Sequence, residues 1–436
     1  MKKVTRRATS ALLVAALILV GMVVYVLRFA DQGRDWVLFS ANRNIYENGA
    51  LASGTVTDRS GAVLVRVEDG VYHYADDQST RLATLHAVGD PGGNIGTGAL
   101  RAFADRLSGY SLIGGVSGRE GRVQLSIDAE LNKTAYAALA GRRGAVMVMD
   151  YTTGEILCMV SSPSYDPNLG FDPDSSAYEG VYLNRCLSSV YTPGSVYKLV
   201  TLAAAIDTLP DLEERSFWCG GSTVIGGVAV NCTGVHGSQT IEQALANSCN
   251  CAFAEISLEL GPDTLAKYAQ ALGFCDSHEI NGISTRAGSF EKAAERSADL
   301  AWSGIGQYTD LVNPYAMLRY VAAIANGGTA VEGTLLMDER GGKTSLLSSD
   351  TAEAIASMMS YTVTYAYGAD NFPGLALCAK SGTAETGDGS SHAWFTGFLD
   401  DEEHPYAFCV VIENGGSGLR NAGAVANTLL QAAVAG

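Results

Sequence analysis

The chain has 436 residues and a hydrophobic content of 47%, which is enough for two or three folded units with sizeable cores. Its 46 acidic residues outnumber its 29 Lys and Arg, so the formal net charge is -17 at pH 7. This charge excludes a general electrostatic attraction to phosphate backbones or anionic lipids, and no nucleic acid is expected among the partners.

The first element in chain order is a predicted membrane-spanning helix. An apolar run from Ala8 to Leu27 follows four basic residues, and Arg28 comes directly after it. The run is long enough to cross a bilayer and has no small-x-small site behind it. We therefore expect residues 1–28 to be a retained signal anchor, with a cleaved signal peptide as the alternative. The positive-inside rule places the N-terminus in the cytoplasm and the rest of the chain outside the cell membrane.

Residues 29–122 predict a small α+β module, a pedestal that carries no obvious chemistry. Strand-like pieces occur at 54–58 and 61–66, and the segment is rich in Gly, Ala and Asp. Its role is expected to be structural.

Residues 123–436 predict a second domain of alternating strands and helices. The expected elements are a strand at 123–127, a helix from Asp128 as N-cap to about Leu139, a hairpin of strands at 144–150 and 155–161, helices at 199–209 and 240–246, strands at 375–382, 394–399 and 406–413, and a closing helix at about 421–434. Strands at both ends with helices between them indicate an α+β fold. We expect one antiparallel sheet, a helical subdomain inserted into it, and a cleft between the two.

Three short motifs occur in this domain, in the order Ser195-Val-Tyr-Lys198, Ser248-Cys-Asn250 and Lys380-Ser-Gly-Thr383. Each is weak alone, because a chain of this length should contain about two S-x-x-K and about one S-x-N by chance. Ser289-Phe-Glu-Lys292 and Ser40-Ala-Asn42 are such additional matches. Context and order must therefore carry the interpretation.

Ser195 has the most informative context. It follows Pro193 and Gly194 and precedes an apolar stretch from Leu199, so it is predicted to lie at a helix N-terminus, where free N–H groups favour developing negative charge. Lys198, one turn later, can reach the serine hydroxyl. A neutral Lys198 could take that proton if burial lowers its pKa. The alternative is an N-capping serine beside a surface lysine.

The other two motifs supply candidate walls of the cleft. Ser248 and Asn250 follow a predicted helix and offer a hydroxyl for proton transfer and an amide for a substrate peptide group; a helix cap is the alternative. Lys380 ends an apolar strand, where Gly382 would let the substrate backbone approach closely. For this motif the alternative is a strand end with a solvated lysine.

Together the motifs resemble those of the serine penicillin-recognising superfamily, and more narrowly those of class B (monofunctional) penicillin-binding proteins. Further segments similar to this class lie at 54–61, 144–150, 162–168, 304–307, 324–328 and 394–397. The resemblance covers about residues 50–436 and is strong after residue 123. It implies a penicillin-binding, β-lactamase-like transpeptidase domain and the activity of a peptidoglycan D,D-transpeptidase that β-lactams inhibit.

The resemblance also implies a role for each motif position. Ser195 would be the acylated nucleophile, Lys198 its general base, Ser248 and Asn250 the second catalytic wall, and Lys380, Ser381, Gly382 and Thr383 the side that binds the substrate carboxylate. The backbone N–H groups of Ser195 and Thr383 would form the oxyanion hole. The implied substrate is a stem peptide ending in D-Ala-D-Ala. No cofactor is implied for the chemistry, and glycan polymerisation is expected from a polytopic membrane glycosyltransferase partner.

Two rival functions share these motifs. A β-lactamase or D,D-carboxypeptidase would pass the acyl group to water, but no glutamate in this sequence stands out as a deacylating base. A non-catalytic β-lactam sensor or scaffold would carry a signalling part or lack one of the motifs, and all three are present. Transpeptidation therefore remains the favoured interpretation.

Cysteine and histidine residues support a separate hypothesis. Cys219, Cys232, His236 and Cys249 make up a complete donor set for structural Zn²⁺. A disulfide between Cys219 and Cys232 is the alternative for an exported protein. Four other cysteines are expected in the core, namely Cys158, Cys186, Cys378 and Cys409, while Cys251 and Cys275 have no assigned place. His392 is interpreted as structural, because no titratable partner lies near it in sequence.

Overall fold

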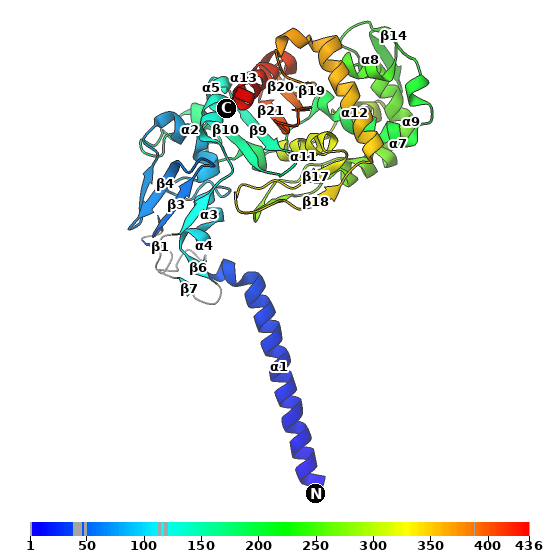
Figure 1. Cartoon of the computed structure of the whole chain (residues 1–436). Coiled ribbons are helices and arrows are strands. Elements are labelled where there is room, and N and C mark those ends of the chain that lie inside the picture. Colours follow the sequence, from blue (N-terminus) through cyan, green and yellow to red (C-terminus); the bar gives the residue numbers. More distant parts are fainter. Residues whose placement is uncertain are drawn as a thin grey trace.

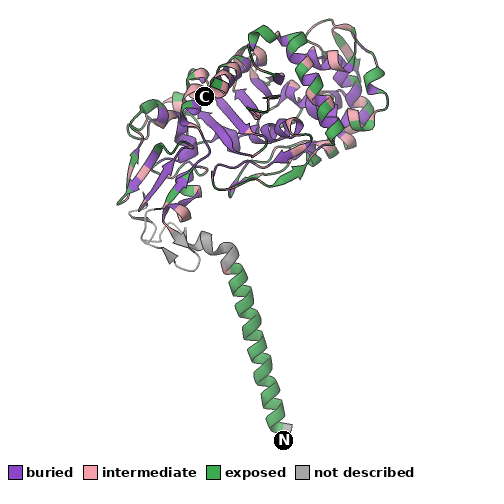
Figure 2. Cartoon of the chain, viewed as in Figure 1, coloured by how far each residue is buried: buried purple, intermediate pink, exposed green. Residues whose placement is uncertain are grey.

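The structure is a computed structural model that describes residues 2–37, 46–47, 50–111, 115–116, 121–387 and 389–435. Helix α1 (Lys2–Val37) projects from the folded body (Figure 1). Its segment Lys3–Phe29 is long and apolar enough to cross a membrane, and it is exposed along its length (Figure 2). The predicted anchor helix is therefore present by length and composition.

A four-stranded sheet follows in the order β5-β4-β3-β8. Its strands are β3 (Gly54–Thr57), β4 (Val63–Glu68), β5 (Val71–Tyr74) and β8 (Arg122–Gln124), with helices α2 (Gln78–Val88), α3 (Ala99–Ala102) and α4 (Ala104–Leu107) alongside. Two small pairs, β1 (Tyr46–Glu47) with β2 (Ala50–Leu51) and β6 (Tyr110–Ser111) with β7 (Gly115–Val116), complete the described part of this region.

Strand β8 joins this sheet to the rest of the chain. It runs parallel to β3, with Val123 opposite Val56. The strand predicted at 123–127 is shorter than expected, because Leu125 already leaves the ladder and pairs with Leu336 in an isolated bridge. The segment expected to open the second domain thus also completes the first sheet.

The centre of the molecule is a five-stranded antiparallel sheet in the order β10-β9-β21-β20-β19. The strands are β9 (Gly144–Asp150), β10 (Ile156–Ser162), β19 (Leu377–Glu385), β20 (Ser391–Leu399) and β21 (Tyr406–Ile412). Because β21 pairs with β9, strands more than two hundred positions apart in the chain become neighbours. The predicted hairpin and the predicted assembly from distant segments are both confirmed.

Helices cover both faces of this sheet, which explains the continuous apolar runs of its strands. Along β9, Met147 and Met149 pack in one core with α11 (Pro314–Ala325), while Val146 and Val148 pack in a second core. That second core contains residues of α5 (Ala129–Leu139) and α13 (Gly423–Ala435). Alternate side chains therefore face opposite helical layers. The Asp128 side chain accepts from the N–H of Leu131 and caps α5, as predicted.

The helical subdomain lies between β10 and β19 in the chain and beside β19 in space (Figure 1). Its helices are α6 (Arg185–Ser188), α7 (Lys198–Thr208), α8 (Ile241–Ala246), α9 (Asn250–Ala271), α10 (Ala298–Ser303) and α12 (Ser349–Thr362). Its short strand pairs are β11 (Phe217–Cys219) with β14 (Gly237–Gln239), β12 (Ser222–Ile225) with β13 (Val228–Asn231), β15 (Glu279–Ile280) with β16 (Ile283–Ser284), and β17 (Thr329–Val331) with β18 (Lys343–Ser345). The expected α+β class is confirmed.

Candidate active site

Ser195 lies in the 3-10 turn η2 (Gly194–Tyr197), which continues directly as α7. Gly194 has a φ of +57°, and a Cβ there would lie 2.9 Å from the carbonyl oxygen of Thr383 on β19. Glycine therefore permits both the left-handed backbone and the close approach of the turn to the strand. Ser195 begins an apolar helix beside the sheet edge, as its sequence context predicted.

Lys198 is fully buried one turn after Ser195. Its Nζ lies 3.1 Å from Ser195 Oγ and donates to the Ser248 carbonyl oxygen at 2.6 Å and to Asn250 Oδ1 at 2.7 Å. Burial lowers the pKa of Lys198 to about 8, against the opposing influence of nearby cysteine thiols. An amine with this pKa is partly neutral near neutral pH and can accept a proton from the serine hydroxyl.

Ser248 connects the end of α8 to the start of α9. Its φ of 50° lies in the left-handed region, which costs a non-glycine residue about 1–3 kcal/mol. Asn250 donates through Nδ2 to the Asn231 carbonyl oxygen at 2.8 Å, so its Oδ1 is turned toward Lys198. The second motif therefore stands as a strained, fixed wall opposite the nucleophile.

Lys380 on β19 completes the cluster. Its buried Nζ donates to Ser248 Oγ at 3.0 Å and to the Ser381 carbonyl oxygen at 2.8 Å. Ser248 Oγ also lies 3.2 Å from Lys198 Nζ, so one hydroxyl connects both amines. Burial, followed by the charge of Lys198, lowers the pKa of Lys380. The acceptors named for the two amines are neutral hydroxyls, carbonyls and an amide, so the cluster favours an anionic ligand.

Gly382 has a packing role that the sequence did not predict. The sequence interpretation reserved the space beside it for substrate backbone, but a Cβ there would lie 2.9 Å from the Pro193 carbonyl oxygen and 3.1 Å from Val196 Cγ1. The glycine thus lets the segment that carries Ser195 pack against β19. This packing role is an addition to the predicted approach of substrate backbone, which stays a prediction.

The edge of β19 presents backbone donors near Ser195. The Ser381 N–H points away from β20 to the hydroxyl of Tyr367, at 2.7 Å, so the Thr383 N–H two residues later points to the same outer edge. The Ser195 N–H belongs to the first turn of a helix, where amides have no intrahelical acceptor. The oxyanion hole formed by these two amides stays a prediction.

Tyr367 and Gly418 are functional neighbours that sequence reasoning missed. Tyr367 contacts Ser381, and the Gly418 N–H donates to Thr383 Oγ1 at 3.2 Å. Neither residue belongs to a motif, and both come from π-helical turns, η4 (Val363–Tyr367) and η6 (Gly418–Ala422). No local pattern marks such contacts, because they depend on which segment covers the sheet edge.

The additional match at Ser289 and Lys292 does not enter the cluster. Lys292 forms an exposed ion pair with Asp263 at 2.8 Å, and Ser289 pairs with Leu311 in an isolated bridge. Ser40-Ala-Asn42 lies outside the described residues. His392 Nδ1 accepts from the Asn414 N–H at 3.2 Å and its ring packs on Tyr191, in agreement with a structural role.

The predicted metal ligands do come together. The ligand atoms of Cys219, Cys232, His236 and Cys249 all lie within 4.8 Å of one another. Tetrahedral Zn²⁺ separates two sulfurs by about 3.8 Å and a sulfur from an imidazole nitrogen by about 3.6 Å. Cys232 Sγ lies 3.7 Å from Cys249 Sγ and 3.6 Å from His236 Nδ1. The donor set therefore fits zinc, and all nine cysteines are free thiols in this structure.

The remaining cysteines divide as expected, with one addition. The four predicted core cysteines, Cys158, Cys186, Cys378 and Cys409, are buried. Cys251, which had no assigned place, is buried beside the cluster and interacts with Cys219. Cys275 is half-buried outside it.

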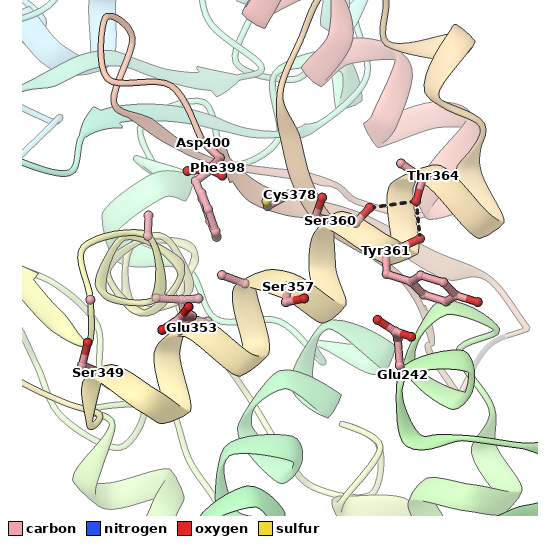
Figure 3. A pocket seen from close by; sticks show the side chains of 14 residues that line it. Glu242, Ser349, Glu353, Ser357, Ser360, Tyr361, Thr364, Cys378, Phe398 and Asp400 are labelled. Carbon is pink, nitrogen blue, oxygen red and sulfur yellow. Dashed lines mark hydrogen bonds between the residues drawn. The ribbon is translucent and has the colours of Figure 1, made fainter. Parts of the chain in front are cut away.

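A cavity of about 590 Å³ lies beside α12, away from the motifs. Figure 3 shows Glu242, Glu353 and Asp400 around it, and its lining contains no motif residue. These carboxylates would repel the anionic ligand that Lys198 and Lys380 favour, so the cavity does not extend the site.

Comparisons with known proteins agree with this geometry. Residues 144–431 match the family described as penicillin binding protein transpeptidase domain. The chain is 29% identical over 389 residues to the peptidoglycan D,D-transpeptidase PbpA of Mycolicibacterium smegmatis, covering 77% of each chain. The solved D,D-transpeptidase domain of a peptidoglycan glycosyltransferase from Eggerthella lenta is 27% identical, with a TM-score of 0.72 over 88% of this chain and 98% of that one. The penicillin G acyl-enzyme of penicillin-binding protein A from M. tuberculosis, 24% identical, has the same fold, with a TM-score of 0.71 over 88% and 99% of the two chains.

Proposed function

This chain belongs to the penicillin-binding protein transpeptidase family, and from that premise we propose that it is a peptidoglycan D,D-transpeptidase acting through an acyl-enzyme on Ser195. The observation that carries the assignment is the meeting of the three motifs around Ser248 Oγ, with Lys198 Nζ 3.1 Å from Ser195 Oγ. β-Lactams are the expected inhibitors, because they acylate the same hydroxyl.

The residues account for each bond that forms or breaks. Neutral Lys198 takes the Ser195 proton while Oγ attacks the carbonyl of the penultimate D-Ala, and the N–H groups of Ser195 and Thr383 hold the resulting oxyanion. The bond to the terminal D-Ala nitrogen then breaks, and that amine receives the proton from Lys198 through the Ser248 hydroxyl. In the second half, the amine of a neighbouring stem peptide attacks the ester, gives up its proton along the same path, and releases Ser195.

The test is to find which residue carries the acyl group. Full-length protein in detergent is treated with benzylpenicillin and digested, and the peptides are analysed by mass spectrometry. We expect one adduct, on Ser195. An adduct on another serine, or none, would contradict the proposal.

The rate of label loss separates transpeptidase from hydrolase. A β-lactamase or carboxypeptidase passes the acyl group to water, so turnover within seconds would favour that alternative. Persistent label in the absence of an acceptor amine supports transpeptidation.

The acylation rate should rise with pH through about 8, the pKa to which burial lowers Lys198. Only the neutral amine accepts the serine proton, so below this pKa the rate should fall about tenfold per pH unit. Stopped-flow measurement with a fluorescent penicillin from about pH 6 to about pH 9 checks this. A flat profile would exclude Lys198 as the titrating base.

We place the domain outside the cytoplasm, anchored by the apolar helix α1. Support comes from the basic residues before that helix. The proposed division is 1–28 for the cytoplasmic tail and anchor, 29–122 for the pedestal and 123–436 for the transpeptidase domain. Residues 144–431 match a transpeptidase domain, which cross-links stem peptides and does not polymerise glycan. We therefore propose that a separate polytopic membrane glycosyltransferase polymerises the glycan. Co-purification from membranes tests that partnership.

We further propose that Cys219, Cys232, His236 and Cys249 hold one structural Zn²⁺. Cys249 lies between Ser248 and Asn250, and the Asn250 N–H donates to Cys232 Sγ at 3.2 Å. This hydrogen bond holds the backbone of the second motif against a proposed metal ligand. When bound, zinc would fix the second motif and supply no acyl-transfer chemistry.

Replacing Cys232 with Ser should reduce zinc from about one equivalent to less than about a tenth, because the tetrahedral shell loses a thiolate. Elemental analysis of the full-length protein measures this. Cys275→Ser, outside the cluster, is the matched control and should retain zinc. Absence of zinc from the unaltered protein, with thiol titration showing Cys219 and Cys232 oxidised, would establish the disulfide instead.

A further inference from the structure

Tyr367 stands behind the third motif and is not part of it. It is the last residue of η4, its side chain is 7% exposed, and its ring packs on Phe395 with centroids 5.9 Å apart. The phenol oxygen accepts the Ser381 N–H at 2.7 Å, and the phenol O–H donates to Ser381 Oγ at 2.9 Å. One buried side chain thus fixes both the backbone and the hydroxyl of Ser381.

These two hydrogen bonds determine where the Ser381 hydroxyl proton can point. Because Tyr367 donates its only proton to Ser381 Oγ, the serine must direct its own proton elsewhere. Thr383 is arranged in the same way, since the Gly418 N–H occupies an acceptor position of its Oγ1. Ser381 and Thr383 are two residues apart on β19, so their side chains leave the strand on the same face.

The surroundings select the chemistry of the ligand for these two donors. The amine of Lys380, the residue before Ser381, is a further donor of the site, and its acceptors in the cluster are a neutral hydroxyl and a carbonyl oxygen. Two hydroxyl donors together with an amine donor fit a carboxylate, which accepts through both oxygens. In the proposed reaction the donor peptide carries such a group on its terminal D-Ala, and most β-lactams carry one on the fused ring.

We propose that Tyr367 is a positioning residue for the substrate carboxylate. It acts by orienting the Ser381 hydroxyl so that this hydroxyl donates its proton to the carboxylate. This inference rests on the proposed function and deepens it. Burial raises the pKa of Tyr367 to about 12, so the phenol keeps its proton across the working pH range.

A second consequence concerns the backbone. Because the Ser381 N–H already donates to Tyr367, the first N–H on the outer edge of β19 that can pair with substrate is that of Thr383.

The test compares Tyr367→Phe with unaltered full-length protein, using benzylpenicillin and its methyl ester as probes. Phenylalanine keeps the ring packing on Phe395 and removes only the hydroxyl. A hydrogen bond to a charged group corresponds to about 10- to 100-fold in rate, so the second-order acylation rate with benzylpenicillin should fall by that factor. The ester has no carboxylate, and its rate should change less than about threefold.

Tyr365→Phe is the matched control, because Tyr365 lies in the same turn, is 53% exposed and stacks on Tyr361. It should change neither rate. Equal slowing of both probes by Tyr367→Phe would mean a merely structural role, and no change with either would remove the role; both results overturn the inference.

Ser381→Ala gives a second route if Tyr367→Phe does not fold. It keeps the Ser381 N–H bond to Tyr367 and should lower the acid-to-ester rate ratio about 10- to 100-fold. An unchanged ratio would overturn the inference. Failure of the proposed function looks different, since the unaltered protein would then not be labelled on Ser195 by either probe.

Discussion

Replacing Ser195 with Ala should abolish covalent labelling by penicillin, a loss of more than about 10⁴-fold in acylation rate. The remaining hydroxyls of the cluster cannot substitute for it. Ser248 Oγ lies between two amines on the opposite wall, and Ser381 Oγ already accepts from Tyr367. Gel fluorescence with a labelled penicillin and intact-protein mass spectrometry measure the loss.

The control for this variant is Ser289→Ala in the other S-x-x-K match, where labelling should be unchanged. The Ser195 hydroxyl makes one side-chain contact in the cluster, with Lys198 Nζ, so the thermal midpoint of Ser195→Ala should remain close to that of the unaltered protein. Labelling that persists in Ser195→Ala would identify another nucleophile and refute the mechanism.

The sequence predicted the central sheet well because its strands have a strong physical signature. Strands β9 and β10 are buried on both faces and therefore read as continuous apolar runs. Boundaries were less predictable. The strand expected at 375–382 extends as β19 to Glu385, since pairing with β20 continues to Glu385 opposite Ser391. That continuation is decided by the partner strand and not by local composition.

The candidate site was predictable in its members and less so in its contacts. Local context placed Ser195 at a helix start, and spacing placed Lys198 one turn away. Nothing local indicates that Ser248 has a positive φ, because that strain is held by the helices on either side. The roles of Gly382 and Tyr367 likewise depend on close approaches between segments far apart in the chain.

Replacing Lys198 with Met should slow acylation by about 10³- to 10⁴-fold, the range that a positioned general base contributes. Met fills a similar volume but has no amine to take the Ser195 proton. The variant removes a buried amine, but the Ser248 carbonyl oxygen and Asn250 Oδ1 each lose a hydrogen bond, so the thermal midpoint is measured beside the rate to show that the variant is folded. Rapid-quench acylation with benzylpenicillin measures the rate.

The pH profile of this variant distinguishes a base from a positioning group. If the neutral Lys198 amine is the base, the residual rate of Lys198→Met should lose the rise near pH 8 that the unaltered protein shows. Lys292→Met, a surface change in the other S-x-x-K match, should keep both the rate and the rise. A rise that survives in Lys198→Met would assign the titration to another group. The first candidate is Lys380, because burial also lowers its pKa and its amine donates to the same Ser248 Oγ.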